Sequence, residues 1–546
     1  MCIIHTNDDG SYDHSGALLK LKGRSLESLG HYAIAVGSHD FSPYFNLAMT
    51  SVTELMRSFI DDDSSVLEFA YVFVANFAMA MGKHGEFKNF LSILIPYLQR
   101  SAVESFEVNI KVAALIALGS LAQHTEDLFL AYLDSTLEVI SQALKSHHSE
   151  VQNSALKYLQ FYVIVAGSSE GLNNPAAKKG EILMIRGNGT FSKTLQRVLE
   201  WVWDVISTGK QMSPVTSSLE ALKCIIDYVG IAAMTLRDLQ TFQPYGDLLK
   251  DAILVFLDGK APCQLALVTE NDDEGEDDHH DKYVLPSVCD VIESLAKAHG
   301  HGYLETFELY IPLLLKFTED ARSFSDSAMV VGTFANVISE IGAAAVKHVD
   351  LILPTLQRDC RDEVTENRRN ACYCLAVIVD SLPVDMLEQY VPSFLDWMWP
   401  LLVRSPASVT SDRGDADVDN AVAAASRIIR RCPEHQRVPQ LLPLVLAALP
   451  LTADFDECTT VFDMLIMLVT SSPLASYTVA NFGNILKVFS HALSEESRYP
   501  QKHGVANSVT ECLQLLRSSA SQGNSEVQSA LDDSSFSLGT IGKMTM

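Results

Sequence analysis

The feature that most constrains this chain is a proline motif that returns at a nearly constant interval. An apolar residue, a proline, any residue and a second apolar residue recur, and the prolines concerned are Pro96, Pro312, Pro354, Pro392 and Pro443. The last four lie 42, 38 and 51 residues apart. Repeats of ~40 to 47 residues are typical of chains that stack one small two-helix unit many times. The interval therefore predicts a repeat architecture rather than one large core.

Apolar residues recur at helical spacing from end to end, as in Val330, Phe334, Val337 and Ile341. A short amphipathic helix pair cannot bury its apolar face alone, so successive pairs must stack. Strand patterns are scarce, and the best of them, 162–165 with 182–185, flank a loop and could equally be helix ends. We therefore expect an all-α HEAT-repeat solenoid, a right-handed superhelix of antiparallel helix pairs.

Several predicted helices end in an apolar residue followed by glycine. The glycines are Gly37, Gly82, Gly230 and Gly342. Glycine after the last helical residue commonly adopts a positive φ and closes the helix. We expect each of these four to end a helix.

Composition excludes several classes of function. Acidic residues outnumber basic ones by 68 to 40, and the net charge of −28 repels nucleic acid and anionic membranes. No segment reaches the ~18 consecutive apolar residues of a membrane span, and the N-terminus has no signal-peptide pattern. The sequence predicts an intracellular protein with no membrane insertion and no direct nucleic-acid binding.

Breaks in the pattern give the expected domain organisation. Residues 1–269 and 282–517 form the two parts of the solenoid, separated by an acidic segment at 270–281. From 518 to 546 the chain turns Ser- and Gly-rich, and we expect a flexible tail or a loose cap there. Residues 167–189, rich in Gly, Asn and Ser, predict a long surface loop.

The acidic segment is the first candidate for binding a partner. Eight of its twelve residues are acidic, namely Glu270, Asp272, Asp273, Glu274, Glu276, Asp277, Asp278 and Asp281. Such a run repels itself and does not pack, so one interpretation is a solvated insertion. The other is a tether that attracts Lys- and Arg-rich segments of other proteins over long range.

Tryptophans supply the second candidate. They occur as two W-x-W pairs, Trp201 with Trp203 and Trp397 with Trp399. Residues two apart do not share a helix face, so one of each pair is expected in the core. The other could anchor a partner, and Trp397 and Trp399 are our candidates, with core packing of all four left open.

Motifs for chemistry are weak. Residues 167–171 match G-x-S-x-G with Ser169 as nucleophile, but the helix that this motif requires does not follow. No phosphate-binding loop is present, and His279 and His280 lie in a segment without fixed geometry for a metal. We expect no enzyme activity, no cofactor and no metal site.

Several stretches resemble repeats of the importin-beta (karyopherin-beta) family, particularly its importin-four type. They are Arg24 to Gly30, Ala33 to Gly37, Phe41 to Tyr44, Ser327 to Ala335, Glu363 to Ala371, Val418 to Ala421 and Leu442 to Leu451. Their order and the acidic insertion before residue 283 make the combination specific. The resemblance corresponds to roughly the C-terminal half of a family member.

The resemblance implies a nuclear transport receptor. Such a protein binds basic cargo, including ribosomal proteins and histones, carries it past nucleoporins, and releases it when Ran-GTP binds in the nucleus. The N-terminal repeats with the principal Ran-binding region have no counterpart here, so cargo binding follows more directly than Ran regulation. The alternative is a HEAT-repeat scaffold subunit of a constitutive complex unrelated to transport.

Overall fold

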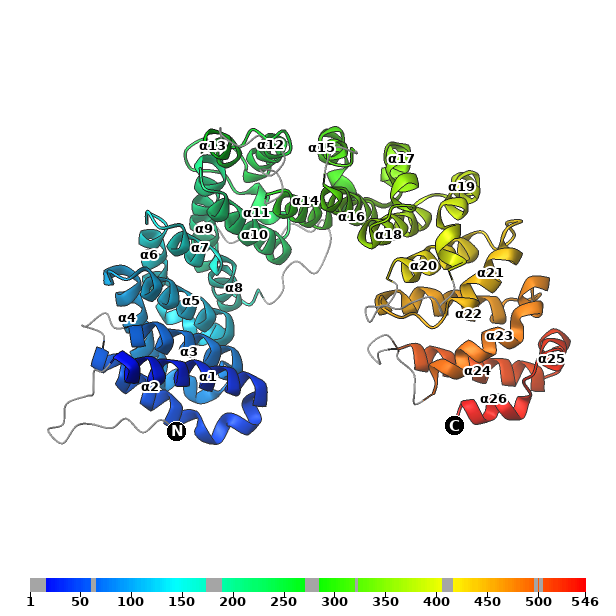
Figure 1. The fold of residues 1–546 in the computed structure, drawn as a ribbon, viewed down its shortest axis with the longest axis horizontal. Helices are drawn as coiled ribbons and strands as arrows, with labels where there is room; N and C mark the ends of the chain where they lie inside the picture. Colours follow the sequence, from blue (N-terminus) through cyan, green and yellow to red (C-terminus); the bar gives the residue numbers. More distant parts are fainter. Residues whose placement is uncertain are drawn as a thin grey trace. The chain divides into compact units, whose positions relative to one another are not determined.

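We analysed a computed structural model that describes residues 16–59, 65–172, 189–270, 284–319, 323–404, 416–494, 499 and 504–546. The chain divides into two compact units, Met1–Gly300 and His301–Met546. The boundary falls after helix α14 and not at the acidic segment, because α14 packs on α10 of the first unit. Each unit is a stack of helices (Figure 1).

The first unit contains these helices: α1 Gly16–Phe41, α2 Phe45–Phe59, α3 Ser65–Met81, α4 Lys88–Glu104, α5 Val108–Thr125, α6 Leu133–Ala143, α7 Ser149–Leu156, α8 Leu159–Ser169, α9 Thr190–Thr208, α10 Met212–Val229, α11 Ala232–Thr235, α12 Tyr245–Leu257, α13 Pro262–Glu270 and α14 Leu285–His299. Within the described residues of the chain no strand forms, and a single β-bridge joins Arg237 to Pro244.

The second unit contains these helices: α15 Leu304–Lys316, α16 Phe324–Ile341, α17 Val349–Asp359, α18 Thr365–Ser381, α19 Val384–Leu402, α20 Ala416–Arg431, α21 Val438–Ala447, α22 Cys458–Thr470, α23 Ser476–Ala492, α24 Val505–Ser521, α25 Ser525–Asp532 and α26 Leu538–Met544. The prediction of an all-α HEAT-repeat fold is confirmed.

The helices form two layers in each unit. We call the second helix of each pair a B helix, and in the first unit α1, α3, α5, α7 with α8, α10 and α14 pack on one another in that order. In the second unit α16, α18, α20, α22, α24 and α26 do the same. The first helices of the pairs, the A helices, form the other layer: α2, α4, α6, α9 and α12, and then α15, α17, α19, α21, α23 and α25. The core lies between the two layers.

The motif prolines all lie inside A helices, in α4, α15, α17, α19 and α21. Each of the five prolines is exposed. A proline removes one backbone hydrogen bond, and an exposed position leaves the unpaired carbonyl on the solvent side. The repeat therefore tolerates the proline because it sits on the outer side of its helix.

Three of the four glycines follow the last residue of a helix, and two of these three have a positive φ. Gly230 and Gly342 follow α10 and α16 with φ of 68° and 65°. Gly37 also has a positive φ, 81°, but it kinks α1 instead of ending it. Gly82 follows α3 without a positive φ, so that expectation was wrong in detail.

The structure decides between the two interpretations of residues 162–165, strand or helix end, and it moves the start of the predicted loop at 167–189. Residues 162–165 belong to helix α8 and form no strand, while 182–185 lie outside the described residues. Helix α8 also continues through Gly167 to Ser169, so the predicted surface loop begins later than expected. The run is apolar because α8 packs against α5, α9 and α10, and buried helices lack the alternation of an exposed one.

The last residues of the chain are helical where a tail or loose cap was expected. Helix α25 packs on α23 and α24, and α26 packs on α24. Ile541 of α26 is fully buried. Helices α25 and α26 therefore continue the packed layers of the second unit.

One stretch, Ser325–Asp359, has the length and apolar composition of a membrane span, with a mean hydropathy of 1.6. It is not one straight helix, because the backbone turns at Gly342 between α16 and the 3-10 helix η6, Gly342–His348. Half of the most apolar part of this stretch is buried inside the structure. Its hydrophobicity is accounted for by core packing.

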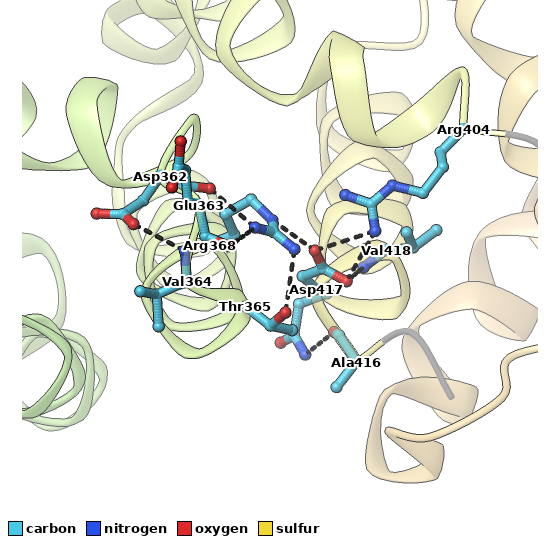
Figure 2. A network of polar contacts seen from close by, with 10 residues as sticks. Asp362, Glu363, Val364, Thr365, Arg368, Arg404, Ala416, Asp417 and Val418 are labelled. Atoms are coloured by element: carbon cyan, nitrogen blue, oxygen red, sulfur yellow. Dashed lines mark hydrogen bonds and ion pairs between the residues drawn. The ribbon is translucent and has the colours of Figure 1, made fainter. Parts of the chain in front are cut away.

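A buried carboxylate fastens neighbouring repeats of the second unit together (Figure 2). The Asp417 side chain, in the first turn of α20, is fully buried. Arg368 of α18 donates from Nε to its Oδ2 at 2.6 Å, and Arg404 Nη1 lies 3.3 Å from the same oxygen. Nη1 of Arg368 also donates to the carbonyls of Asp362 and Glu363, at 2.8 Å each. One guanidinium thus joins the α17–α18 turn to α20.

We predict that Asp417→Asn lowers the free energy of unfolding by about 2 to 4 kcal/mol, because it leaves two partly buried arginines without their counter-charge. Urea denaturation followed by circular dichroism measures this. The matched control is Asp463→Asn on the exposed face of α22, which should change stability by no more than about 0.5 kcal/mol. Equal effects of the two substitutions would contradict the role given to Asp417.

Close packing of B helices also depends on Gly119 in α5. A Cβ at this position would lie 2.0 Å from Cγ of Tyr158, which sits between α7 and α8. We predict that Gly119→Ala destabilises the protein by about 1 to 3 kcal/mol, since the two helices must move apart. Thermal unfolding measures this, and Gly85→Ala, where no atom lies within 4 Å, is the control. A neutral Gly119→Ala variant would show that the contact is looser than described.

Candidate protein-binding surface

The predicted acidic tether lies almost wholly outside the described residues. Asp272, Asp273, Glu274, Glu276, Asp277, Asp278 and Asp281 belong to the undescribed part of the chain. Glu270 is the last residue of α13. Helix α14 begins at Leu285, so the acidic segment lies between α13 and α14 in the sequence.

The candidate tryptophans lie on α19 in different surroundings. Trp397 is 8% exposed and packs against Phe394 with ring centroids 5.6 Å apart. Trp399 is half-buried, and the guanidinium of Arg437 covers its ring at 5.2 Å. Arg437 is itself held by Asp396 at 2.5 Å. A partner would have to displace Arg437 to reach the Trp399 ring, and Trp397 offers little surface.

The other tryptophan pair lies on α9. Arg197 covers the half-buried ring of Trp201 at 4.8 Å. Trp203 packs toward the core beside Leu222 and Tyr245. Trp201 and Trp203 are both half-buried, so the expected split into a buried and an accessible ring occurs on α19 and not on α9. The cation–π cover of Trp201 and Trp399 could not be read from the W-x-W spacing.

Carboxylates gather on two neighbouring B helices of the first unit, α10 and α14. Glu220 and Asp227 lie on α10, and Asp290 and Glu293 lie on α14. We call these four residues the α10–α14 acidic surface. Helices α10 and α14 pack directly on each other, so the four residues belong to one surface of the B layer.

Two lysines neutralise one member of this surface. Lys223 Nζ lies 3.3 Å from Oδ2 of Asp227, and Lys297 Nζ lies 3.6 Å from its Oδ1. Glu220 and Asp290 are exposed, and neither has an ion pair with any of the described residues. These two carboxylates are therefore available to a cationic partner.

The pKa shifts show that the negative charges are close together. Neighbouring atoms remove part of the solvent from the exposed carboxyl of Asp290, and this desolvation and the charge of Asp227 raise its pKa, against the effect of Lys223. Burial also raises the pKa of the Cys224 thiol, and Asp227, Glu220 and Asp290 raise it further. Like charges that interact this way gain from a cation placed among them.

The α10–α14 acidic surface places negative charges close together, an arrangement that attracts cations. Ser169 is the last residue of α8, and its hydroxyl donates to the Ala166 carbonyl at 2.7 Å, as helix-end serines do. Among the described residues no three His, Cys, Asp or Glu side chains form a metal-binding group. The sequence missed the α10–α14 surface because its members are about 70 residues apart, although the i, i+7 spacing of Glu220 and Asp227 marks one helix face.

Among the described residues, the grooves of the second unit include two that bear on partner binding. One, of about 410 Å³, lies between A helices α21 and α23 and is lined by apolar side chains including Leu446, Leu449 and Val488. The other, of about 470 Å³, lies at the ends of α16 and α18 beside Asp380 and Arg427. In the second groove Arg427 already pairs with Asp380 at 2.8 Å and with Glu457 at 2.7 Å.

Comparison with known proteins gives a consistent result. The chain is 26% identical over 386 residues to Importin-4 of Mus musculus, covering 70% of this chain and 33% of that protein. It is 26% identical to Importin-4 of Homo sapiens over 434 residues, covering 79% and 37%. It is 22% identical to the probable importin subunit beta-4 of Schizosaccharomyces pombe, covering 90% and 48%. No protein-family model matches the chain.

Solved structures share the fold. The karyopherin Kap121p bound to the SUMO protease Ulp1p superposes with a TM-score of 0.66 at 14% identity, covering 97% of this chain and 49% of that one. Kap121p bound to Nup53p gives a TM-score of 0.62 at 15% identity, covering 96% and 48%. The chain thus spans about a third to a half of the length of the proteins that it matches.

The fold and the acidic surface define a HEAT-repeat solenoid of the kind that binds other proteins. The sequence similarity narrows this further: over 70 to 90% of its length the chain is similar to importins of the importin-beta (karyopherin-beta) family.

Proposed function

We propose that this chain is a nuclear transport receptor of importin-beta type that binds basic proteins for import through the nuclear pore. Ribosomal proteins and histones are the expected cargo, and the receptor moves between cytoplasm and nucleus. The mechanism is binding and release, with no catalytic step, no cofactor and no metal. The observation that carries the proposal is the similarity to importins, which extends over 70 to 90% of the chain.

The α10–α14 acidic surface supports the choice of basic cargo. Glu220 and Asp290 are exposed, and neither forms an ion pair with any of the described residues. The acidic segment at 270–281 precedes α14 in the sequence and contains eight acidic residues. Charge of this density raises the association rate of positively charged partners and selects against acidic ones.

The similarity to importins also suggests how the cargo is released and how the receptor passes the nuclear pore. We propose that Ran-GTP releases the cargo, as in other importins of this type. Kap121p has been solved in complex with the nucleoporin Nup53p, and we extend that partner class to this chain. Trp397 and Trp399 remain candidates for a partner contact that requires Arg437 to move away from Trp399.

Charge reversal tests the acidic surface. The double variant Glu220→Lys with Asp290→Lys should bind a labelled Lys- and Arg-rich peptide at least about tenfold more weakly, because attraction becomes repulsion. Fluorescence anisotropy measures the dissociation constant.

The matched control is Asp134→Lys with Asp251→Lys. These residues are exposed on A helices α6 and α12 of the same unit, and the change in net charge is identical. It should weaken binding far less than the first variant. If both variants lose affinity equally, the chain attracts the peptide through net charge alone and the surface has no special role.

The pH dependence gives a second test. Basic peptides bind the ionised carboxylates, and the raised pKa of Asp290 means that its charge is lost at a higher pH than that of an ordinary aspartate near about 3.9. As pH falls from 7, the affinity of the wild type for a histidine-free peptide should begin to drop earlier than that of Asp290→Asn. Superimposable pH profiles would remove Asp290 from the binding surface.

A further inference from the structure

The loop that joins α11 to α12, residues 236–245, exposes two large apolar side chains. Leu239 is 61% exposed and Phe242 is 70% exposed. We call these two residues the apolar tip. In this loop the only exposed charged side chain is that of Arg237, although the chain as a whole carries a net charge of −28. The tip is therefore chemically different from the α10–α14 acidic surface.

The backbone of this loop is fixed by its own hydrogen bonds. Arg237 and Pro244 form an antiparallel bridge. Inside it the N–H of Asp238 donates to the Gln243 carbonyl, and the N–H of Phe242 donates to the Asp238 carbonyl, both at 2.9 Å. These backbone hydrogen bonds close the loop into a turn.

Side chains complete the support. The buried carboxylate of Asp238 accepts the N–H and the hydroxyl of Thr241 at 2.7 Å each. Burial acts to raise the pKa of Asp238, but these hydrogen bonds outweigh it and lower the pKa, so the carboxylate stays charged and in place. Gln196 of α9 donates to the Arg237 carbonyl at 3.0 Å and fastens the loop to the solenoid.

Phe242 adopts a backbone conformation that disfavours its own side chain. Its φ is +60°, which bulky residues rarely adopt and glycine adopts without strain. Arg237 Nη1 holds this conformation by donating to the Phe242 carbonyl at 2.8 Å. An exposed aromatic ring at such a position adds nothing to the core and costs stability. Strained residues of this kind are found where function requires them.

We propose that the apolar tip docks into an apolar pocket on the folded domain of a cargo whose basic segment binds the α10–α14 acidic surface. This inference rests on the proposed function and adds to it a second contact of different chemistry. A disordered basic segment has few apolar residues and cannot cover Leu239 and Phe242, whereas a folded domain offers such pockets. Helix α10, which carries Glu220 and Asp227, leads through α11 to this loop.

The test compares two probes from one cargo. The first is a labelled core-histone heterodimer with its tails, and the second is a peptide of one histone tail alone. The variant Leu239→Ser with Phe242→Gly should bind the heterodimer about tenfold more weakly, as loss of an aromatic anchor does. It should bind the tail peptide as the wild type does. The Phe242→Gly single variant should melt at the same temperature as the wild type or higher, because glycine removes the strain.

Controls separate this inference from the proposed function. Leu309→Ser with Leu351→Ser removes two leucines that are each 49% exposed on A helices α15 and α17 and should leave binding of both probes unchanged. Glu220→Lys with Asp290→Lys should weaken both probes. If that variant weakens them and the tip variant weakens neither, the tip has no role in cargo binding while the proposed function stands.

Two further outcomes overturn the inference. If the wild type binds neither probe, the proposed function and the tip contact fail together. Wild-type protein and the double variant Leu239→Ser with Phe242→Gly should also be tested for co-sedimentation with phosphatidylcholine vesicles. If the wild type co-sediments and the double variant does not, the tip inserts into lipid and the proposed protein contact is wrong.

Discussion

The stacking of B helices on one another is the constraint on which the rest of each unit depends. A pair such as α17 and α18 has too little apolar surface to fold alone, and α18 acquires a buried environment by packing against α16 and α20. Apolar contact alone would allow neighbouring helices to slide. Polar contacts set the register, and one of them is made by the fully buried Asp417, which Arg368 and Arg404 hold. A buried charge that has lost its partners is far more costly than a slightly misplaced leucine.

Much of this architecture could be predicted from the sequence, because repetition makes local patterns informative. The proline shared by five of the A helices, such as Pro354 in α17, gave the period of the repeat. The local pattern was ambiguous where a helix is buried on several sides. Residues 162–165 look like a strand because a helix packed on several sides has no polar face. Contacts between distant residues, such as Arg437 on Trp399, leave no trace in local spacing.

The candidate binding surfaces show the same limit. The acidic segment at 270–281 was evident from composition, but the placement of Glu220 beside Asp290 required the packing of α10 on α14. The φ of Phe242 likewise depends on a hydrogen-bonded loop that no propensity encodes. The α10–α14 surface suits flexible basic segments, whose affinity derives from long-range attraction, and the apolar tip suits a preformed pocket. A receptor with both kinds of contact would discriminate among cargoes that share only a positive charge.

The most direct test of the account is the salt dependence of binding between this chain and a purified basic cargo, such as a core-histone heterodimer. Equilibrium binding should be measured from low to physiological ionic strength, with and without Ran-GTP. If the chain is a receptor for basic cargo, its affinity for the heterodimer should fall steadily as salt screens the carboxylates. Ran-GTP should also release the heterodimer. Cargo binding that is absent even at low salt, or that is indifferent to both salt and Ran-GTP, would contradict the account and favour a constitutive scaffold.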